Sequence, residues 1–162
     1  MTHVGEGLLL PNGQTLENRI VKSAMSEALA DENGDPTEAL INAFSRWGAG
    51  GAGLLVTGNT PVDRMHLEHA GNFVLDPDTD MSRVSALVEA AHSGGTKILA
   101  QLSHAGRQTP EAVNPHPMSI SDVQLDLPGY GCPIAANEPE LTRVIGCFAR
   151  SAVLAQDAGF DG

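Results

Sequence analysis

The stretch RWGAGGAGLLVTG, from Arg46 to Gly58, decides which fold this chain adopts. Its glycines Gly48, Gly50 and Gly53 fit the pattern G-x-G-x-x-G, which can mark the phosphate-binding loop of a dinucleotide site. Such a loop must follow a strand and open a helix, because the N-terminus of the helix has to face the pyrophosphate. The residues on either side of the glycines therefore determine what the pattern means.

Those flanking residues have the opposite order, with a helix before the glycines and a strand after them. Residues 37–47 form an amphipathic pattern that Thr37 can cap, with Leu40, Phe44 and Trp47 at helical spacing. Residues 53–58, GLLVTG, form a short apolar run that is typical of a buried parallel strand. We interpret the glycines as a helix end and a tight turn into a strand, and not as a nucleotide loop.

The same order of strand, helix and glycine turn repeats along the chain. A small hairpin around Pro11-Asn12-Gly13 precedes a first strand over residues 19–25. A second helix begins at a cap on Asp80 or Ser82 and stops at Gly94-Gly95, and the third strand, TKILAQLS, follows. Three successive units of this kind predict an α/β fold with a parallel sheet.

A long loop and a long helix complete the predicted order. The loop, about residues 103–139, carries six prolines, and loops of this length are usually functional or disordered. Tyr130 in this loop is a candidate substrate contact. The helix begins near Glu138 and ends at Gly159, and its expected apolar face consists of Leu141, Val144, Ile145, Phe148, Ala152 and Ala155.

Composition excludes several classes of protein. The formal net charge of −11 over 162 residues disfavours nucleic acid and anionic membranes as partners. Cys132 and Cys147 have neither the spacing of a zinc site nor that of a disulfide framework. The N-terminus lacks the features of a signal peptide, and no apolar run approaches the roughly 18 residues of a membrane span. We therefore expect a cytoplasmic protein with a small-molecule substrate.

Polar residues lie where the predicted parallel strands end, which is where α/β proteins bind their ligands. Gln101 stands where an apolar strand favours an aliphatic residue, and its amide offers donors and an acceptor on one plane, a match for a flavin pyrimidine ring. The alternative is a glutamine that ties the next loop to the sheet. The other candidates at strand ends are Ser23, Ala24, Met25, Ser26 and Asn59.

Histidines raise a second possibility, a metal site. His104 and Arg107 follow the third strand, and His66 and His69 form H-x-x-H in a loop-like stretch. His104 could be an acid/base group, a metal ligand or a structural hydrogen-bonding residue. No carboxylate or second histidine stands beside it at a recognised ligand spacing, so we expect no metal.

Four stretches in this order resemble the Old Yellow Enzyme family of NADH:flavin oxidoreductases: LENRIVKSAM, GLLVTGNTPVDRMHLEHAGNFVLD, ILAQLSHAGRQ and AGFDG. The resemblance implies an FMN-dependent (β/α)8 barrel in which Gln101 reads the pyrimidine edge of FMN. It also implies that residues 23–26 contact the flavin, largely through their backbone. Ser26 stands where relatives have Thr or Cys, and Asn59 stands where they commonly have a small residue.

The resemblance also implies the reaction and its cofactors. NAD(P)H gives a hydride to FMN, and the reduced flavin passes a hydride to an electron-poor alkene or a related acceptor. The usual barrel has about 250 residues and eight strands, so we expect this chain to be the N-terminal part of a TIM barrel, with about three βα units after the hairpin. The substrate-binding and proton-donor residues are expected beyond Gly162.

A chain of this kind is expected to be inactive alone and to self-associate through its open sheet. Two alternatives remain open at this point. The first is a non-catalytic half-barrel that acts only by complementation with a second chain. The second is a metal-dependent TIM-barrel hydrolase that uses His66, His69 or His104.

Overall fold

A three-stranded parallel sheet forms the centre of the fold in the computed structural model, which describes residues 3–162. Its strands have the order β3-β4-β5, and each is followed along the chain by a helix. The elements in chain order are β3 (Val21–Lys22), α1 (Glu38–Ala49), β4 (Leu54–Pro61), α2 (Met81–His92), β5 (Lys97–Ser103) and α3 (Glu138–Ala158). The predicted plan of three parallel βα units is confirmed.

The glycine-rich stretch connects α1 to β4, as its flanking residues predict. The helix ends at Ala49, and Gly51 adopts a φ of 82°, a left-handed conformation that glycine takes without strain. Gly48 has a second role, because a Cβ there would lie 2.2 Å from the carbonyl oxygen of Ala91 on α2. The glycines therefore let α1 pack closely on α2 and let the chain turn back into the sheet.

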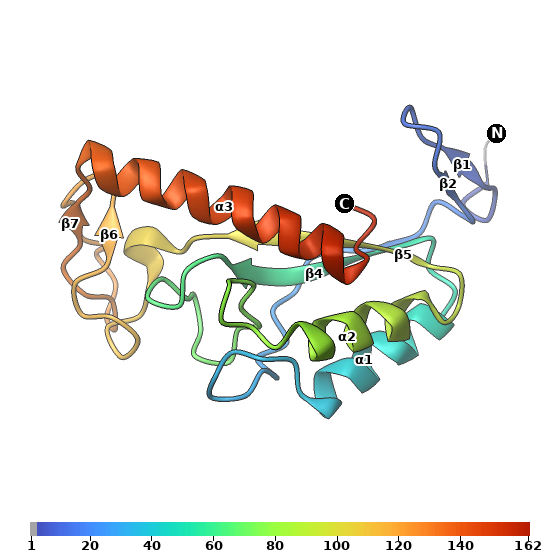
Figure 1. Ribbon diagram of the computed structural model, residues 1–162, viewed down its shortest axis with the longest axis horizontal. Helices are drawn as coiled ribbons and strands as arrows, with labels where there is room; N and C mark the ends of the chain where they lie inside the picture. The colour runs from blue at the N-terminus through green and yellow to red at the C-terminus, as the bar shows by residue number, and fades with distance from the viewer. Residues whose placement is uncertain (1–2) are drawn as a thin grey trace.

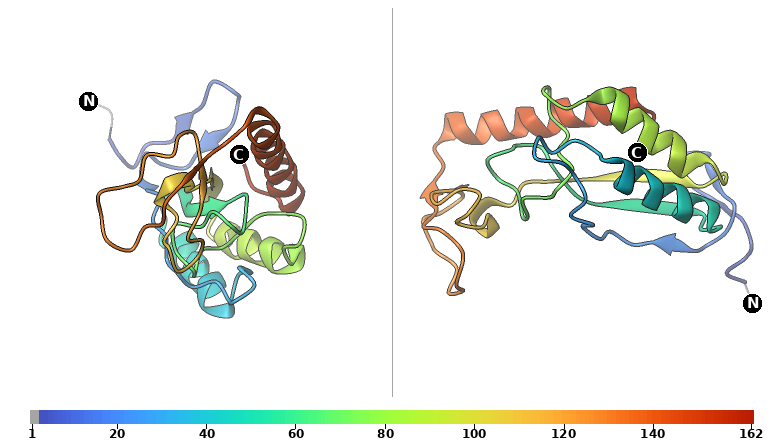
Figure 2. Two further views of the ribbon diagram at one scale, coloured as in Figure 1. Left: turned by 90° about the vertical axis from the view of Figure 1, so that its left-hand side faces the viewer. Right: turned by 90° about the horizontal axis from the view of Figure 1, so that it is seen from below.

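The three helices curve around one face of the sheet, which the end-on view in Figure 2 shows most clearly. The core lies between that face and the helices. On β4 the side chain of Leu55 is buried, and on β5 that of Ile98. The helices contribute Leu40 and Phe44 from α1, Val84, Leu87, Val88 and Ala91 from α2, and Ala155 and Ala158 from α3. The other face of the sheet is only half buried.

Two small pairs of strands lie at opposite ends of the molecule (Figure 1). The predicted hairpin is formed by β1 (Leu8–Leu9) and β2 (Thr15–Leu16), which pair antiparallel. At the carboxyl end of the sheet, the long loop contains a 3-10 turn, η1 (Gly106–Gln108), and a parallel pair, β6 (Met118–Ser119) and β7 (Ile134–Ala135). Within residues 3–162 no helix combines the length and the hydropathy that crossing a membrane requires.

The first two strands differ in length from the prediction. The strand predicted over residues 19–25 pairs with β4 only at Val21 and Lys22, whereas β4 continues to Pro61. The register between β4 and β5 shifts between Val56 and Asn59. At this irregularity Met25 and Ser26 pass directly over Gly58, where a Cβ would lie 2.2 Å from the carbonyl oxygen of Met25. Beyond Lys22, close packing of the backbone on Gly58 thus replaces the hydrogen-bonded pairing between β3 and β4.

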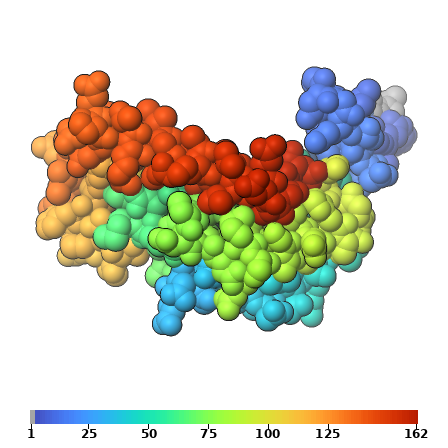
Figure 3. Space-filling view, in the orientation of Figure 1, coloured from blue at the N-terminus to red at the C-terminus, as the bar shows by residue number. Residues whose placement is uncertain are grey.

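The predicted buried face of α3 is wrong for most of its length. The buried residues are Cys147, Ser151, Ala155 and Ala158, of which only Ala155 belongs to the predicted face. Small side chains let α3 approach β5 and α2, so the helix turns its bulkier apolar residues away from the sheet. Ile145 is 69% exposed, and with Leu141, Val144 and Phe148 it lines an open apolar groove beside Met118 and Ile120. Figure 3 shows α3 along the upper surface of the molecule.

Candidate functional site

Polar side chains from three neighbouring strand ends meet at the carboxyl edge of the sheet. Nε2 of Gln101 donates a hydrogen bond of 2.6 Å to Oδ1 of Asn59, its direct partner in the β4–β5 register. The backbone N–H of Asn59 donates to Oγ of Ser26 at 3.3 Å. The structure therefore brings together three of the residues that the sequence singles out: Ser26, Asn59 and Gln101.

A carboxylate that sequence reasoning missed joins these residues. Glu68, in the loop after β4, accepts hydrogen bonds from Oγ of Ser26 and from Nδ2 of Asn59. Nδ2 of Asn72 lies 3.5 Å from Oε1 of Glu68 and 3.3 Å from the carbonyl oxygen of Asn59. We call these five residues, Ser26, Asn59, Glu68, Asn72 and Gln101, the edge cluster. The sequence indicated a role for Glu68 only through its place, as an acidic residue in the loop that follows a strand end.

The carboxylate of Glu68 is held in its ionised form. Burial acts to raise the pKa of Glu68, but the hydrogen bonds from Ser26, Asn59 and Asn72 outweigh it and lower the pKa below its usual value. The neighbouring His69 adds a smaller effect in the same direction. At neutral pH this side chain therefore only accepts hydrogen bonds.

Ser23, Ala24 and Met25 form an exposed segment that leads into Ser26 of the edge cluster. Ser23, Ala24 and Met25 are exposed, and the side chain of Met25 is 55% exposed. Nζ of Lys22 lies 3.3 Å from the carbonyl oxygen of Ser23, and the same nitrogen lies 3.2 Å from the carboxylate of Glu27. Lys22 thus links the start of the segment to Glu27 at its end.

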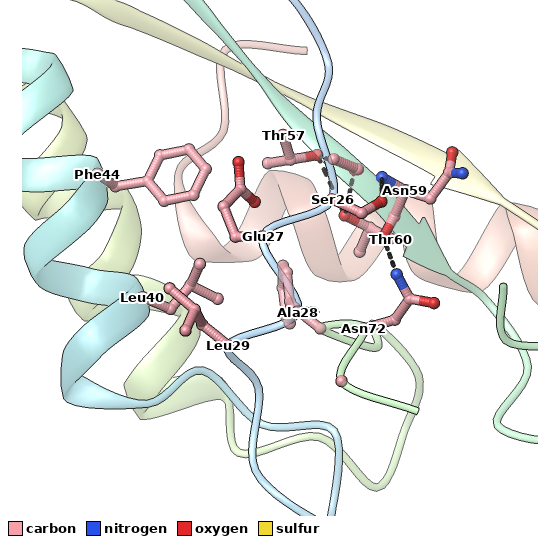
Figure 4. A pocket seen from close by; sticks show the side chains of 13 residues that line it. Ser26, Glu27, Ala28, Leu29, Leu40, Phe44, Thr57, Asn59, Thr60 and Asn72 are labelled. Carbon is pink, nitrogen blue, oxygen red and sulfur yellow. Dashed lines mark hydrogen bonds between the residues drawn. The ribbon is translucent and has the colours of Figure 1, made fainter. Parts of the chain in front are cut away.

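A small cavity lies beneath the segment, between α1 and β4 (Figure 4). Its volume is about 20 Å³, and Leu40, Phe44 and Thr60 are among the residues that line it. A cavity of this size can hold no more than about one water molecule. This cavity is therefore too small for a ligand of several rings.

His104 belongs to a second, separate cluster. Its ring stacks on the ring of His66 with 4.2 Å between the centroids, and Nδ1 of His66 lies 3.2 Å from Oδ2 of Asp63. Arg143 of α3 reaches the same oxygen at 2.9 Å. These residues come from three separate segments, so the group ties the loop after β4 and the loop after β5 to α3.

The hydrogen bonds of this cluster assign the ring protons. Nε2 of His66 accepts the N–H of Met118 at 2.9 Å, so its proton is on Nδ1, facing Asp63. Burial, reinforced by the neighbouring His66, lowers the pKa of His104 to about 4. Burial acts to raise the pKa of Asp63, but hydrogen bonds from His66, the Met65 N–H and Arg143 outweigh it and hold the pKa well below its usual range.

Asp63, His66 and His104 bring possible ligand atoms within 4.8 Å of one another, a proximity that the sequence spacing did not reveal. A cation at this point would have to replace Arg143 at Asp63 and remove the Nδ1 proton of His66 while Met118 occupies Nε2. Nε2 of His66 is thus engaged by the Met118 N–H, and the carboxylate of Asp63 is already paired with a guanidinium. The donor set fits a structural hydrogen-bonded group better than a metal centre.

The remaining candidates lie outside both clusters. Nη1 of Arg107 lies 3.4 Å from the carbonyl oxygen of Val123, within the long loop. Tyr130 forms a backbone bridge with Pro110, also within that loop. Nδ1 of His69 accepts the N–H of Gly71 at 3.0 Å, which closes a turn beside the edge cluster. Within residues 3–162 no hydrogen bond joins Arg107 or Tyr130 to the edge cluster.

Comparison with known proteins identifies the relatives of this chain. The NADH:flavin oxidoreductase / NADH oxidase family matches residues 9–162. The NADH-dependent flavin oxidoreductase nadA of Aspergillus parasiticus is 39% identical over 177 aligned residues, which cover 94% of this chain and 40% of nadA. The chain therefore spans less than half the length of this relative.

Solved structures establish the fold. The old yellow enzyme homologue from Zymomonas mobilis superposes with a TM-score of 0.88 at 24% identity, covering 99% of this chain and 47% of that chain. Morphinone reductase in complex with tetrahydroNAD superposes with a TM-score of 0.89 at 21% identity, covering 99% and 48%. The predicted architecture, part of a TIM barrel of the Old Yellow Enzyme type, is confirmed.

Proposed function

Because this chain belongs to the NADH:flavin oxidoreductase / NADH oxidase family, we propose that it supplies the first strands of an FMN-binding barrel. The observation that carries the proposal is the meeting of Ser26, Asn59 and Gln101 in one hydrogen-bonded cluster at the carboxyl edge of the sheet. In α/β barrels this edge is where ligands bind. The flavin would lie along residues 23–26, Asn59 and Gln101.

The groups at this edge fit a flavin ring. Within residues 3–162, Oε1 of Gln101 accepts no hydrogen bond, and one of the two Nε2 protons is used by Asn59, so an acceptor and a donor remain for a ligand. The pyrimidine part of a flavin offers both an N–H group and carbonyl oxygens. The exposed side chain of Met25 offers an apolar surface for the ring, and the half-buried face of β4 and β5 continues it.

The reaction proposed for the complete protein is an NAD(P)H-dependent reduction of an electron-poor alkene or a related acceptor. FMN, when bound, supplies the hydride-transfer chemistry. The residues of this chain bind and orient the ring at the edge cluster. The chain matches 40% of the length of nadA. We therefore propose that the residues that bind the acceptor and donate the proton correspond to parts of nadA outside the matched region.

A flavin titration tests the proposal. FMN is added to the purified 162-residue chain, and the flavin fluorescence and the side-chain amide signal of Gln101 are followed by spectroscopy. We expect saturable binding that shifts the Gln101 signal, with lumiflavin, which has the same isoalloxazine ring but a methyl group in place of the ribityl phosphate, as a comparison. A chain that leaves the FMN spectrum unchanged at millimolar concentration, with no shift at Gln101, would contradict the proposal.

One observation favours a second candidate function, that of a half-barrel that acts by complementation. The open edge of β5 already accepts the residues after α3: the N–H of Asp161 donates to the carbonyl oxygen of Ile98, and the N–H of Ala100 donates to that of Gly162, each at 2.9 Å. Beside this edge lies an open groove, whose apolar lining includes Ala100 and Leu102 of β5, Ala152 and Ala155 of α3, and Phe160. Co-expression with the part of nadA that follows the matched region tests this candidate, and restored NADH oxidation only in the mixture would support it.

A further inference from the structure

Glu68 gives the edge cluster a fixed hydrogen-bond polarity. An ionised carboxylate only accepts hydrogen bonds, so every polar atom that faces it has to be a donor. The atoms that face it are Oγ of Ser26 and the side-chain nitrogens of Asn59 and Asn72. Asn72 is also oriented by His69, whose backbone N–H donates to Oδ1 of Asn72 at 2.8 Å. The directions of the Ser26 hydroxyl and of the Asn59 amide follow from the carboxylate, because each of these groups could by itself donate or accept.

The effect on Ser26 is a loss of its donor. A serine hydroxyl has one proton, and this proton is directed to Glu68. The oxygen also accepts the backbone N–H of Asn59 at 3.3 Å. Toward a ligand above the edge, Ser26 therefore offers oxygen lone-pair density and no proton.

The effect continues from Asn59 to Gln101. Since Nδ2 of Asn59 faces Glu68, its Oδ1 faces away from the carboxylate and accepts Nε2 of Gln101 at 2.6 Å. The Gln101 amide is thereby turned so that its Oε1 is left for a ligand. Two successive amides thus transmit the polarity of a carboxylate on one loop to the end of β5.

We propose that Glu68 is a positioning residue: it sets the orientation of the Ser26 hydroxyl and of the Asn59 and Gln101 amides, and so decides which atoms the edge offers to a flavin. The flavin part of this inference rests on the proposed function. The positioning part rests only on the hydrogen bonds within the chain. A glutamine at position 68 would keep the shape of the side chain but could face Asn59 with either its oxygen or its nitrogen.

The test compares E68Q with a matched control, E111Q. Glu111 is exposed in the long loop, and its backbone N–H donates to the carbonyl oxygen of Gly129. Side-chain amide spectra of the wild-type chain and both variants are recorded without flavin. We expect the Asn59 and Gln101 amide signals to move or broaden in E68Q and to stay unchanged in E111Q. Unchanged signals in a folded E68Q would overturn the inference.

FMN is then titrated into the same three proteins. We expect the affinity of E68Q for FMN to fall by roughly fivefold, the equivalent of one ordinary hydrogen bond, and that of E111Q to match the wild type. If the wild type and E111Q bind FMN while E68Q binds equally well with unmoved amides, the role of Glu68 is refuted and the proposed function stands. If no protein binds FMN, the proposed function fails, and the flavin-free spectra still decide the positioning role.

A measurement on the wild type keeps the inference testable if E68Q does not fold. One Nδ2 proton of Asn59 and one Nε2 proton of Gln101 are engaged in hydrogen bonds. We expect these two protons to exchange with solvent more slowly than the side-chain amide protons of Gln156, which is exposed on α3. Exchange as fast as that of Gln156 at both residues would contradict the proposed polarity.

Discussion

Asn59 and Gln101 are direct partners across β4 and β5, and their side chains are joined by a hydrogen bond of 2.6 Å. The bond links two strand ends that are 42 residues apart in the sequence. It leaves the oxygen of the Gln101 amide for a ligand. Through this contact the polar side chains of β4 and β5 form one continuous polar surface near the carboxyl edge of the sheet.

Gln101→Ala should weaken FMN binding by about 1–3 kcal/mol, because polar groups of the ring and of Asn59 would lose their partner. Isothermal titration with FMN measures the change. Gln156→Ala, on the exposed side of α3, is the matched control and should bind as the wild type does. Equal affinities for both variants would remove Gln101 from the binding edge.

Gly58→Ala should disturb the edge from beneath. A Cβ at this position would lie 2.2 Å from the carbonyl oxygen of Met25 and 2.5 Å from Cα of Ser26, so the backbone has to move. We expect a loss of about 1–3 kcal/mol in the free energy of unfolding, the usual cost of overpacking, together with weaker FMN binding. Urea denaturation measures the first effect.

The control for this change is Gly5→Ala, since a Cβ at Gly5 meets no atom within 4 Å. The control should leave the midpoint of unfolding unchanged. A Gly58→Ala variant as stable as the control would show that the segment over β4 adapts without cost.

His104 should make the chain less stable as the pH falls. Its pKa is lowered to about 4 in the folded chain, whereas the unfolded chain has the ordinary value of about 6.5. Between these values the unfolded state binds the additional proton, so the stability contributed by the neutral ring is complete above about pH 6.5 and is lost as the pH falls toward 4. Urea midpoints measured across this window should decline on acidification, and His104→Asn should flatten the decline. An equal slope in the variant would contradict the assignment.

Asp161→Asn should destabilise the end of α3. Oδ2 of Asp161 lies 2.9 Å from Nε2 of His92 and accepts the N–H of Ile98 at 2.9 Å, and Oδ1 lies 2.8 Å from Nζ of Lys97. We expect a loss of about 1–3 kcal/mol at neutral pH, the cost of weakening hydrogen bonds to a partly buried charge. Thermal unfolding measures it, and Asp157→Asn, exposed on α3, is the control.

The same carboxylate has a defined dependence on pH. Burial acts to raise the pKa of Asp161, but the hydrogen bonds from Lys97, the Ile98 N–H and His92 outweigh it and lower the pKa. The stabilisation is therefore complete above the unfolded pKa of about 3.9 and is lost as the pH falls through the lower folded value. In Asp161→Asn the free energy of unfolding should no longer show this decrease at acid pH. If the decrease is the same in the variant and in the wild type, the ion-pair assignment is refuted.

Ile145→Lys should reduce self-association of the chain. Ile145 is 69% exposed in the apolar groove beside α3, and exposed apolar surfaces of this kind promote association. Sedimentation velocity measures the oligomeric state, and Gln156→Lys adds the same charge to another position on the helix. If both variants associate as the wild type does, the groove is not the contact surface.

The sequence by itself determined the order of the elements and the chemistry of the strand ends. Caps, glycine turns and apolar runs are local signals, so Thr37, Asp80 and Gly159 begin or end helices as predicted. The resemblance to a flavin oxidoreductase family could also be recognised, because its motifs are continuous segments. The presence of Ser26, Asn59 and Gln101 at strand ends follows from the same local patterns.

Only the tertiary structure decided which residues meet. Glu68 joins the edge cluster, and His104 joins His66 and Asp63, through contacts between loops whose paths no local pattern specifies. The buried face of α3 was mispredicted for a related reason: a helix with apolar residues on more than one side buries the face whose small side chains allow the closest approach to the sheet. Hydrogen-bond direction likewise depends on the partner, because an amide or hydroxyl can donate or accept until a carboxylate faces it.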